Sequence, residues 1–269
     1  MNIPIAILIV LGAAAVAALA LALLRRRAGG PLLADGGRGG PKIIVTGTLF
    51  AVVLAFVILA AFQTYNGAKT AAQSEAVAVL DMARAADLLP PAQRDQLHAA
   101  FTCYGRAVVA QEWPAMENGH SSPLVERWIA EYRGVYRRLD VRPPREQLAF
   151  KELLDQGATR AAGRLQRLDK ATPSVPTPLW LALVFGGCVA VALQLGLADP
   201  RERFRVEGLM VGGVASVIAA GLLIVYFLDH PYSGHTGGIE PAAMQESLLL
   251  MGGLEPNLRP GCSQTGRPV

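Results

Sequence analysis

The sequence predicts an all-α fold in which four transmembrane helices are joined to an antiparallel helical-bundle insert between the second and third. Hydrophobic residues make up 52% of the chain and charged residues only 17%, whereas soluble domains carry about a quarter charged residues. Two long apolar runs precede the polar insert at residues 63–178, and two follow it. The insert shows helical spacing of apolar residues and no strand-like alternation. The chain is therefore expected to occupy a lipid bilayer, with its insert in water.

Each apolar run is long enough to cross the hydrocarbon core of a membrane as a helix. Arg25, Arg26 and Arg27 follow the first run instead of preceding it, which favours an uncleaved anchor over a signal peptide. The predicted segments, in chain order, are the first transmembrane helix (1–27), a short basic connector (28–42), the second transmembrane helix (43–62), the water-exposed helical domain (63–178), the third transmembrane helix (179–197), a second short basic connector (198–207), the fourth transmembrane helix (208–228) and a Gly/Pro-rich tail (229–269).

Small residues recur at every fourth position in two of the spans. Within a membrane, such a ridge lets a neighbouring helix approach closely. The second span carries Gly47, Ala51 and Ala55, and the fourth carries Gly208, Gly212, Ser216 and Ala220. We expect both ridges to be helix-packing surfaces.

The insert reads as four amphipathic helices with short connections, which predicts a bundle that buries each apolar stripe against another. Residues 68–89 continue the helix of the second span as far as Pro90 and Pro91. Ser122 and Pro123 supply an N-cap and a first-turn proline for the third helix. The stripes of the next three helices are Leu97, Phe101, Tyr104 and Val108; Leu124, Trp128, Tyr132, Val135 and Leu139; and Phe150, Leu154, Ala158, Ala161, Leu165 and Leu168.

Basic residues indicate the orientation. The two connectors and their flanks hold eight Lys and Arg side chains, five in the first and three in the second. By the positive-inside rule both connectors are cytoplasmic, so the insert, the N-terminus and the tail are predicted on the outer side. The charge surplus is explained by this bias, and no basic stripe with interleaved aromatics indicates nucleic-acid binding.

Three cysteines leave one question open. Cys188 lies within an apolar run, and no short Cys spacing indicates a zinc or redox site. Cys103 and Cys262 can pair if they share an oxidising compartment. Nothing in the local sequence brings them together, so both the paired and the unpaired state remain open.

Two acidic positions of the insert are candidates for a polar site. Glu75 is either an exposed helical glutamate or a buried acid paired with an arginine. At Glu112, Trp113 and Pro114, the structural interpretation is a helix stopped by proline with an aromatic packing or interface residue. The functional interpretation makes Glu112 a charge at a pore mouth or a partner of a bundle arginine.

The turn after the fourth span is the other candidate site. Asp229, Pro231, Tyr232 and Gly234 form a helix terminus with a headgroup anchor, or alternatively a cation-coordinating or gating turn. The spacing matches no recognised metal site. The chain shows no nucleophile or paired-carboxylate pattern, so we expect no catalytic centre, no cofactor and no enzymatic activity.

The order of these features resembles the bestrophin-like family of bacterial membrane proteins, over roughly residues 43–251. The likeness rests on the paired spans, Glu75, Glu112-Trp113-Pro114, and the turn that contains Pro231 and Tyr232. That turn is similar to the Pro-Phe-Gly turn of true bestrophins, with tyrosine in place of phenylalanine and one residue inserted. True bestrophins are pentameric anion channels with a cytoplasmic helical domain, and the resemblance implies the same here.

Two features depart from that family pattern. The chain lacks the acidic cluster that follows the turn in calcium-gated bestrophins, so calcium gating is not carried over. The charge bias also places the insert outside. The leading expectation is an oligomeric anion channel in a lipid bilayer, because four spans are too few to enclose a pore alone. The alternative is a non-conducting scaffold or sensor that acts through the helical domain.

Overall fold

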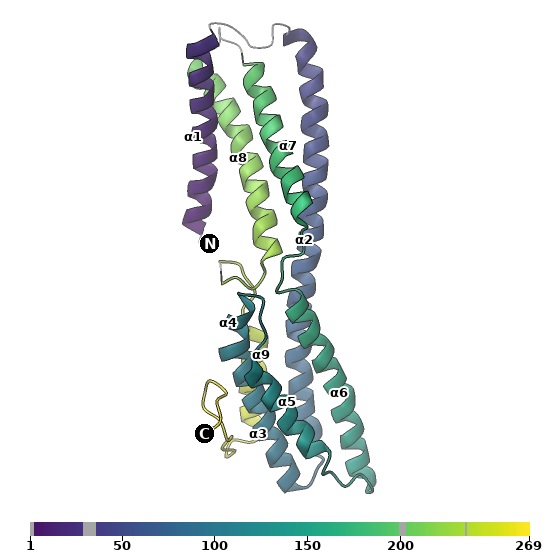
Figure 1. The fold of residues 1–269 in the computed structure, drawn as a ribbon. Helices are drawn as coiled ribbons and strands as arrows, with labels where there is room; N and C mark the ends of the chain where they lie inside the picture. Colours follow the sequence, from purple (N-terminus) through teal and green to yellow (C-terminus); the bar gives the residue numbers. More distant parts are fainter. Residues whose placement is uncertain (1–2, 29–35, 199–202, 235) are drawn as a thin grey trace. The chain divides into compact units, whose positions relative to one another are not determined.

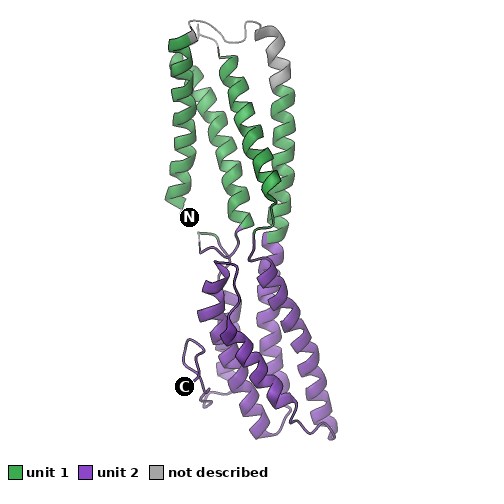
Figure 2. Cartoon of the chain, in the orientation of Figure 1, with its two compact units in different colours: residues 1–64, 173–229, 235–237 green, residues 65–172, 230–234, 238–269 purple. Residues whose placement is uncertain are grey.

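The computed structural model describes residues 3–28, 36–198, 203–234 and 236–269, and these form an all-helical fold (Figure 1). The chain divides into two units, coloured separately in Figure 2. Unit 1 comprises residues 1–64, 173–229 and 235–237, and unit 2 comprises residues 65–172, 230–234 and 238–269. One long helix, α2 (Gly36–Ala86), contributes residues to both.

Unit 1 contains α1 (Ile3–Ala28), the first part of α2, α7 (Thr177–Gly196) and α8 (Phe204–Asp229). Within the described residues, four helical segments are long and apolar enough to cross a membrane: Ile3–Arg27, Ile44–Ala86, Thr177–Gly196 and Phe204–Asp229. The predicted four-span fold with helices between the second and third spans is confirmed.

The two predicted connectors can be followed only in part. Residues 29–35 and 199–202 lie outside the described part of the chain. Helix α2 already begins at Gly36, and α8 begins at Phe204.

Glycines allow the helices of unit 1 to approach closely. A Cβ atom at position 212 would lie 3.4 Å from the backbone oxygen of Ala14 in α1, and one at position 221 would lie 2.7 Å from a methyl carbon of Leu54 in α2. The ridge predicted on α8 is therefore used unevenly: Gly212 is buried, Ser216 and Ala220 are partly buried, and Gly208 has no neighbouring atom within 4 Å of such a Cβ.

Unit 2 is a bundle built from the second part of α2, α3 (Pro91–Ala107), the π-helix η1 (Val108–Glu112), α4 (Trp113–Met116), α5 (Pro123–Tyr136), α6 (Pro144–Asp169) and α9 (Ala242–Leu254). The stripe predicted for the second insert helix is confirmed, because Leu97, Phe101, Tyr104 and Val108 are all buried. Ser122 is the N-cap of α5, as predicted, and its hydroxyl accepts a hydrogen bond from the backbone of Leu124.

The apolar stripe predicted for α6 is wrong in part, because Leu154, Ala158 and Leu165 are exposed while Phe150, Ala161 and Leu168 are partly buried. Leu154 is 49% exposed and Leu165 is 70% exposed, whereas Arg160, Arg164 and Arg167 are buried. The bundle core offers these arginines carboxylate and aromatic partners, so they turn inward together with the fully buried Leu153, whereas Leu154 and Leu165 turn outward.

A disulfide resolves the question left open for the cysteines. Cys103 on α3 is bonded to Cys262 in the tail, with their Cα atoms 5.8 Å apart. Trp128 Nε1 donates a hydrogen bond of 2.7 Å to the backbone oxygen of Gly266, which holds the same tail against the bundle. Cys188 is a free cysteine on α7.

Candidate functional site

Helices α2 and α6 come together at Gly163. A Cβ atom there would lie 2.8 Å from the backbone nitrogen of Glu75 and 3.0 Å from the backbone oxygen of Ala71. Only glycine permits this approach, which places the arginines on either side of Gly163 within reach of Glu75. The polar core of unit 2 is built around this crossing.

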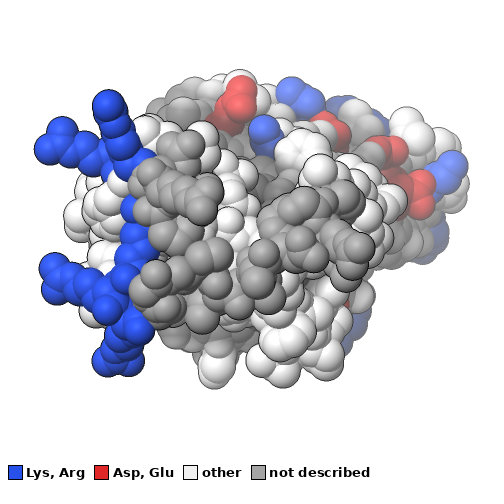
Figure 3. Space-filling view, turned by 90° about the horizontal axis from the view of Figure 1, so that it is seen from above, with Lys and Arg blue, Asp and Glu red and all other residues white. Residues whose placement is uncertain are grey.

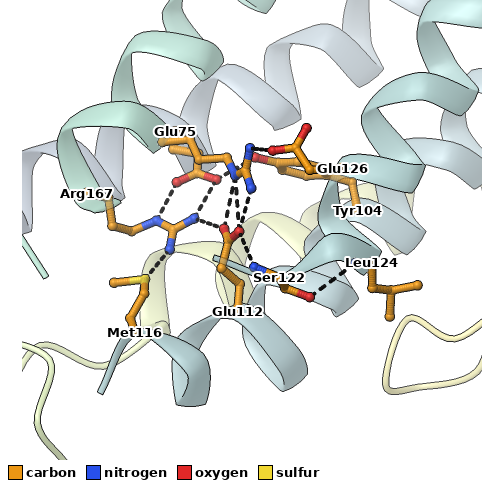
Figure 4. A network of polar contacts seen from close by, with 9 residues as sticks. Glu75, Tyr104, Glu112, Met116, Ser122, Leu124, Glu126 and Arg167 are labelled. Carbon is orange, nitrogen blue, oxygen red and sulfur yellow. Dashed lines mark hydrogen bonds and ion pairs between the residues drawn. The ribbon is translucent and has the colours of Figure 1, made fainter. Parts of the chain in front are cut away.

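Arg167 contacts three side chains of the network in Figure 4, those of Glu75, Glu112 and Met116. Its exposed fraction is 0%, and its Nε and Nη2 atoms donate to the two carboxylate oxygens of Glu75 at 2.6 and 3.0 Å. Nη2 also donates to Glu112 at 2.6 Å, and Nη1 contacts the sulfur of Met116. One guanidinium therefore joins α2, η1 and α4 to α6.

Arg164 makes the second set of ion pairs. Its Nη2 donates to Glu112 at 2.6 Å, and its Nη1 donates to Glu126 of α5 at 2.5 Å. Glu112 also accepts from the backbone nitrogen of Ser122 at 3.2 Å. The Glu112 carboxylate thus bridges two arginines and the N-terminus of α5, where a negative charge is favourable.

The π-helix η1 places Glu112 in the core. A π turn adds a residue to the helix and shifts the side chains that follow it, and such turns recur at functional sites. The widened turn also accommodates Pro114, which lacks the backbone N–H of a regular helical position. The helical path consequently runs on to Met116, and the interpretation that proline stops the helix before this point is wrong.

The network fixes the ionisation of its members. Burial opposes the charge on Glu112, but hydrogen bonds from Arg164 and the charges of Arg167 and Arg164 lower its pKa below the ordinary value. Burial and the negative charge of Glu75 raise the pKa of Tyr104 well above its usual value. Tyr104 therefore keeps its proton and donates it to Glu75 in a hydrogen bond of 2.5 Å.

Aromatic residues cover the network. The Arg167 guanidinium carbon lies 5.2 Å from the ring centroid of Trp113, which meets the ring of Tyr232 edge-on at 5.4 Å. Trp113 donates to the backbone oxygen of Ile239, and the Tyr232 hydroxyl donates to that of Ala68 at 2.9 Å. Glu75, Glu112, Trp113 and Tyr232, chosen from separate parts of the sequence, are thus in one connected site.

The remaining predicted residues lie apart from these contacts. Asp229, in unit 1, is buried, and one of its carboxylate oxygens accepts hydrogen bonds from the backbone nitrogens of Ser174 and Val175 at 2.7 and 2.9 Å. In unit 2, the Pro231 oxygen accepts from the backbone of Ile239 at 2.8 Å. Gly234 adopts φ +61°, a conformation that favours glycine. In the described parts of the chain, no group of three His, Cys, Asp or Glu side chains could hold a metal ion.

Comparison with known proteins decides the family. The model of the bestrophin-like domain matches residues 11–244. The chain belongs to the bestrophin-like family. Its fold is similar to the crystal structure of a bacterial bestrophin homologue from Klebsiella pneumoniae, with a TM-score of 0.67 and 13% identity over 93% of this chain and 98% of that one. A single-substitution variant of that homologue aligns with a TM-score of 0.69 and 14% identity over 92% and 99% of the two chains. No curated protein matches the sequence.

Sequence reasoning found the carboxylates of this bestrophin-like site but not its arginines. Arg160, Arg164 and Arg167 lie three and four positions apart, so they share one helical face. That spacing could have indicated a buried basic face, but the leucines elsewhere on the helix form the amphipathic pattern that normally marks the buried face. Because both buried carboxylates are paired with guanidinium groups, the arrangement acts as an electrostatic clamp across four helices.

Proposed function

We propose that this bestrophin-like chain forms a homo-oligomeric anion-conducting membrane protein with no catalytic activity of its own. The observation that carries the proposal is the match to the bestrophin-like domain, which covers residues 11–244 and overlaps all four candidate spans. The anion preference comes from that family. Because the buried carboxylates are paired with arginines, they support a structural role that holds the bundle together, and they do not suggest a reactive group.

The outer face of α6 supports assembly with further copies of the chain. Three of its exposed apolar residues share one stripe, with Leu154 at 49% exposure, Leu165 at 70% and Ala158 between them. In a water-exposed bundle, a contiguous apolar stripe marks an interaction surface. Identical copies packed around a shared axis would cover it and would surround a pore that four spans cannot enclose alone.

Arginines gather at one end of unit 1, where they favour anions. The Arg25 guanidinium lies 5.8 Å from the ring centroid of Phe204, so the basic end of α1 contacts the start of α8. Arg203 and Arg205 flank Phe204 in the sequence. Seen from above, Lys and Arg side chains line one edge of this face (Figure 3). A positive potential at a pore entrance raises the local anion concentration.

We place unit 2 on the outer side of the membrane, opposite to the orientation that true bestrophins imply. Two independent features support this orientation. The basic residues of the short connectors favour the cytoplasm for that end. The Cys103–Cys262 disulfide of unit 2 favours an oxidising compartment, because cytosolic thiols are kept reduced.

Chloride flux tests conduction. Purified protein in liposomes is expected to release trapped chloride at a rate proportional to the protein added, and native mass measurement is expected to give an oligomer. An intact oligomer without chloride flux would exclude conduction and leave a scaffold or sensor. A monomer without flux would exclude the assembly as well.

Cysteine labelling tests the orientation. Arg127 is exposed on α5 of unit 2, and Arg26 lies at the basic end of α1. An impermeant maleimide applied to intact cells is expected to label Arg127→Cys and to label Arg26→Cys only after permeabilisation. The reverse pattern would place unit 2 in the cytoplasm.

A further inference from the structure

A groove lies between α2, α7 and α8 of unit 1, three helices that stand side by side in Figure 1. It encloses about 440 Å³, and its lining is apolar on all three helices. Phe50 and Ala51 line it from α2, Ala190 from α7, and Leu209 and Val217 from α8. Leu209 is 77% exposed and Val217 is 72% exposed, so the groove opens to the surface of unit 1.

Two glycines of the lining leave this groove unfilled. A Cβ atom at Gly47 or at Gly213 would meet no atom within 4 Å. At Gly212, one position earlier on α8, a Cβ atom would lie 3.4 Å from the backbone oxygen of Ala14 in α1. Helix α8 therefore presents one glycine to α1 and the next to the groove. In a membrane, the space beside the second glycine is filled by hydrocarbon or by another helix.

An arginine stands at one end of the groove. Arg205, Leu209, Gly213 and Val217 follow one another at intervals of four, so they lie along one face of α8. Arg205 is exposed, and within the described residues its guanidinium has no ion-pair or hydrogen-bond partner. From Leu209 to Val217 the helix rises about 12 Å, which is close to the depth of one hydrocarbon leaflet, about 15 Å. This face of α8 therefore matches the layout of a lipid, with a charge at one end of an apolar groove.

The N-terminus of α8 adds to the positive charge of Arg205. Helix α8 begins at Phe204, and the free backbone N–H groups of a first helical turn favour an anion. Arg203 is exposed immediately before that turn. Glu207, the acidic residue of the turn, lies two positions after Arg205 and so does not face the same side of the helix. This end of the groove is suited to a phosphate group, which a guanidinium can bind through two oxygens.

We infer that the groove binds one acyl chain of an anionic phospholipid whose phosphate lies at Arg205 and the start of α8. Acyl chains are as apolar as the groove and differ little between lipids, so the charge at Arg205 selects the headgroup. A zwitterionic phospholipid brings an ammonium group to the same end and is expected to bind more weakly. An apolar helix from a second copy would fill the groove but would leave the arginine without an anion. The site does not depend on the proposed conduction.

Native mass spectrometry of the full chain in detergent tests the headgroup. Dioleoyl phosphatidylglycerol and dioleoyl phosphatidylcholine carry the same acyl chains, so a difference between them reports the charge. We expect phosphatidylglycerol to bind in one copy per chain and more tightly than phosphatidylcholine. Arg205→Gln is expected to weaken phosphatidylglycerol binding about fivefold and to leave phosphatidylcholine binding unchanged. Arg26→Gln removes an exposed charge from α1, which does not line the groove, and is expected to keep the affinity.

Larger side chains in the groove test the acyl chain. Gly213→Leu fills the groove without a clash and is expected to abolish the phosphatidylglycerol site, and Gly47→Leu does the same from α2 if the first variant does not fold. Gly12→Leu is the control, because Gly12 is exposed on α1 and a Cβ there also meets no atom within 4 Å. Soluble glycerol 3-phosphate, which has no acyl chain, is expected not to compete.

Four outcomes would overturn the site. Equal losses in Arg26→Gln and Arg205→Gln would show only a general attraction of anionic lipid to the basic end of unit 1. Phosphatidylglycerol binding that survives both Gly213→Leu and Gly47→Leu would place the lipid elsewhere, and competition by glycerol 3-phosphate would remove the role of the acyl chain. A wild-type chain that binds no lipid, together with a Gly213→Leu variant that loses its oligomer, would assign the groove to a helix of a second copy.

Discussion

At the scale of single residues, Arg167 carries the polar core of unit 2 because one guanidinium is shared between two buried carboxylates. Removing one partner of a buried ion pair leaves the others unpaired in a medium of low dielectric and costs about 3–5 kcal/mol. Arg167→Met is therefore expected to lower the free energy of unfolding by about this amount, measured by thermal or denaturant unfolding in detergent. Arg127→Met, at an exposed position, is expected to change it by less than about 0.5 kcal/mol. Equal effects of the two variants would contradict the clamp.

Acid is expected to weaken the same core through Glu112. Its pKa is lowered in the folded protein below the ordinary 4.5, so its charge stabilises the fold fully at pH values above 4.5. That contribution is lost as pH falls below 4.5 toward the folded pKa. One such group adds at most about 1.4 kcal/mol per pH unit to the slope of stability against pH. Glu112→Gln is expected to be less stable at neutral pH and to show a shallower acid slope, and an unchanged slope would exclude this role.

The sequence allowed the acidic half of the site to be predicted and not the basic half. Glu75 and Glu112 were each recognised as possible partners for an arginine, and both are buried in such pairs. Arg164 and Arg167 were missed because a helix with both leucines and arginines is expected to bury its leucines. Burial of the arginines is favourable only because carboxylates from three other elements lie beside them. The sequence of α6 alone does not show that these carboxylates come together.

At the scale of elements, the crossing of α2 and α6 depends on Gly163, which a methyl group would push away from the backbone of Glu75. Gly163→Ala is expected to destabilise unit 2 by about 1–3 kcal/mol, because the two backbones must separate and the ion pairs lengthen. Gly157 provides a matched control on the same helix, since a Cβ there meets no atom within 4 Å. Gly157→Ala is expected to stabilise the helix by about 0.5–1 kcal/mol. Unfolding midpoints with the same sign for both variants would argue against a close crossing.

The elements were predictable to different degrees for physical reasons. Ser122 and Pro123 mark the start of α5 because capping depends on local sequence. The π turn at Val108–Glu112 was not foreseen, since it has no distinct local signature and is favoured by the contacts that it gives Glu112. Pro114 was taken as a stop signal, although the π turn lets the helical path continue through it.

At the scale of the whole molecule, the four spans were predictable because lipid demands long uninterrupted apolar helices.

The outward stripe of α6 has a consequence for assembly. Leu165→Glu places a charge on a side chain that is 70% exposed in one chain. If copies pack on this stripe, the variant is expected to shift native mass measurements toward the monomer while the unfolding midpoint of the monomer stays unchanged. The neighbouring exposed Gln166→Glu introduces the same side chain and is expected to keep the oligomer. Oligomers of equal mass in both variants would place the interface elsewhere.

The disulfide links the fold of the chain to its compartment, and nothing in the local sequence could have paired residues 159 positions apart. Of three cysteines, only Cys188 is free. Protein from intact cells, alkylated at once and unfolded without reductant, is therefore expected to show one reactive thiol by mass, and three after reduction. Replacing both Cys103 and Cys262 by serine is expected to destabilise unit 2 by about 2–5 kcal/mol. Without the bridge, the unfolded chain gains the conformational entropy that closure of a long loop had removed. Cys188→Ala, as the control, keeps the bridge. Three reactive thiols before reduction would mean that unit 2 faces a reducing compartment, and the outward orientation would then rest on the arginines alone.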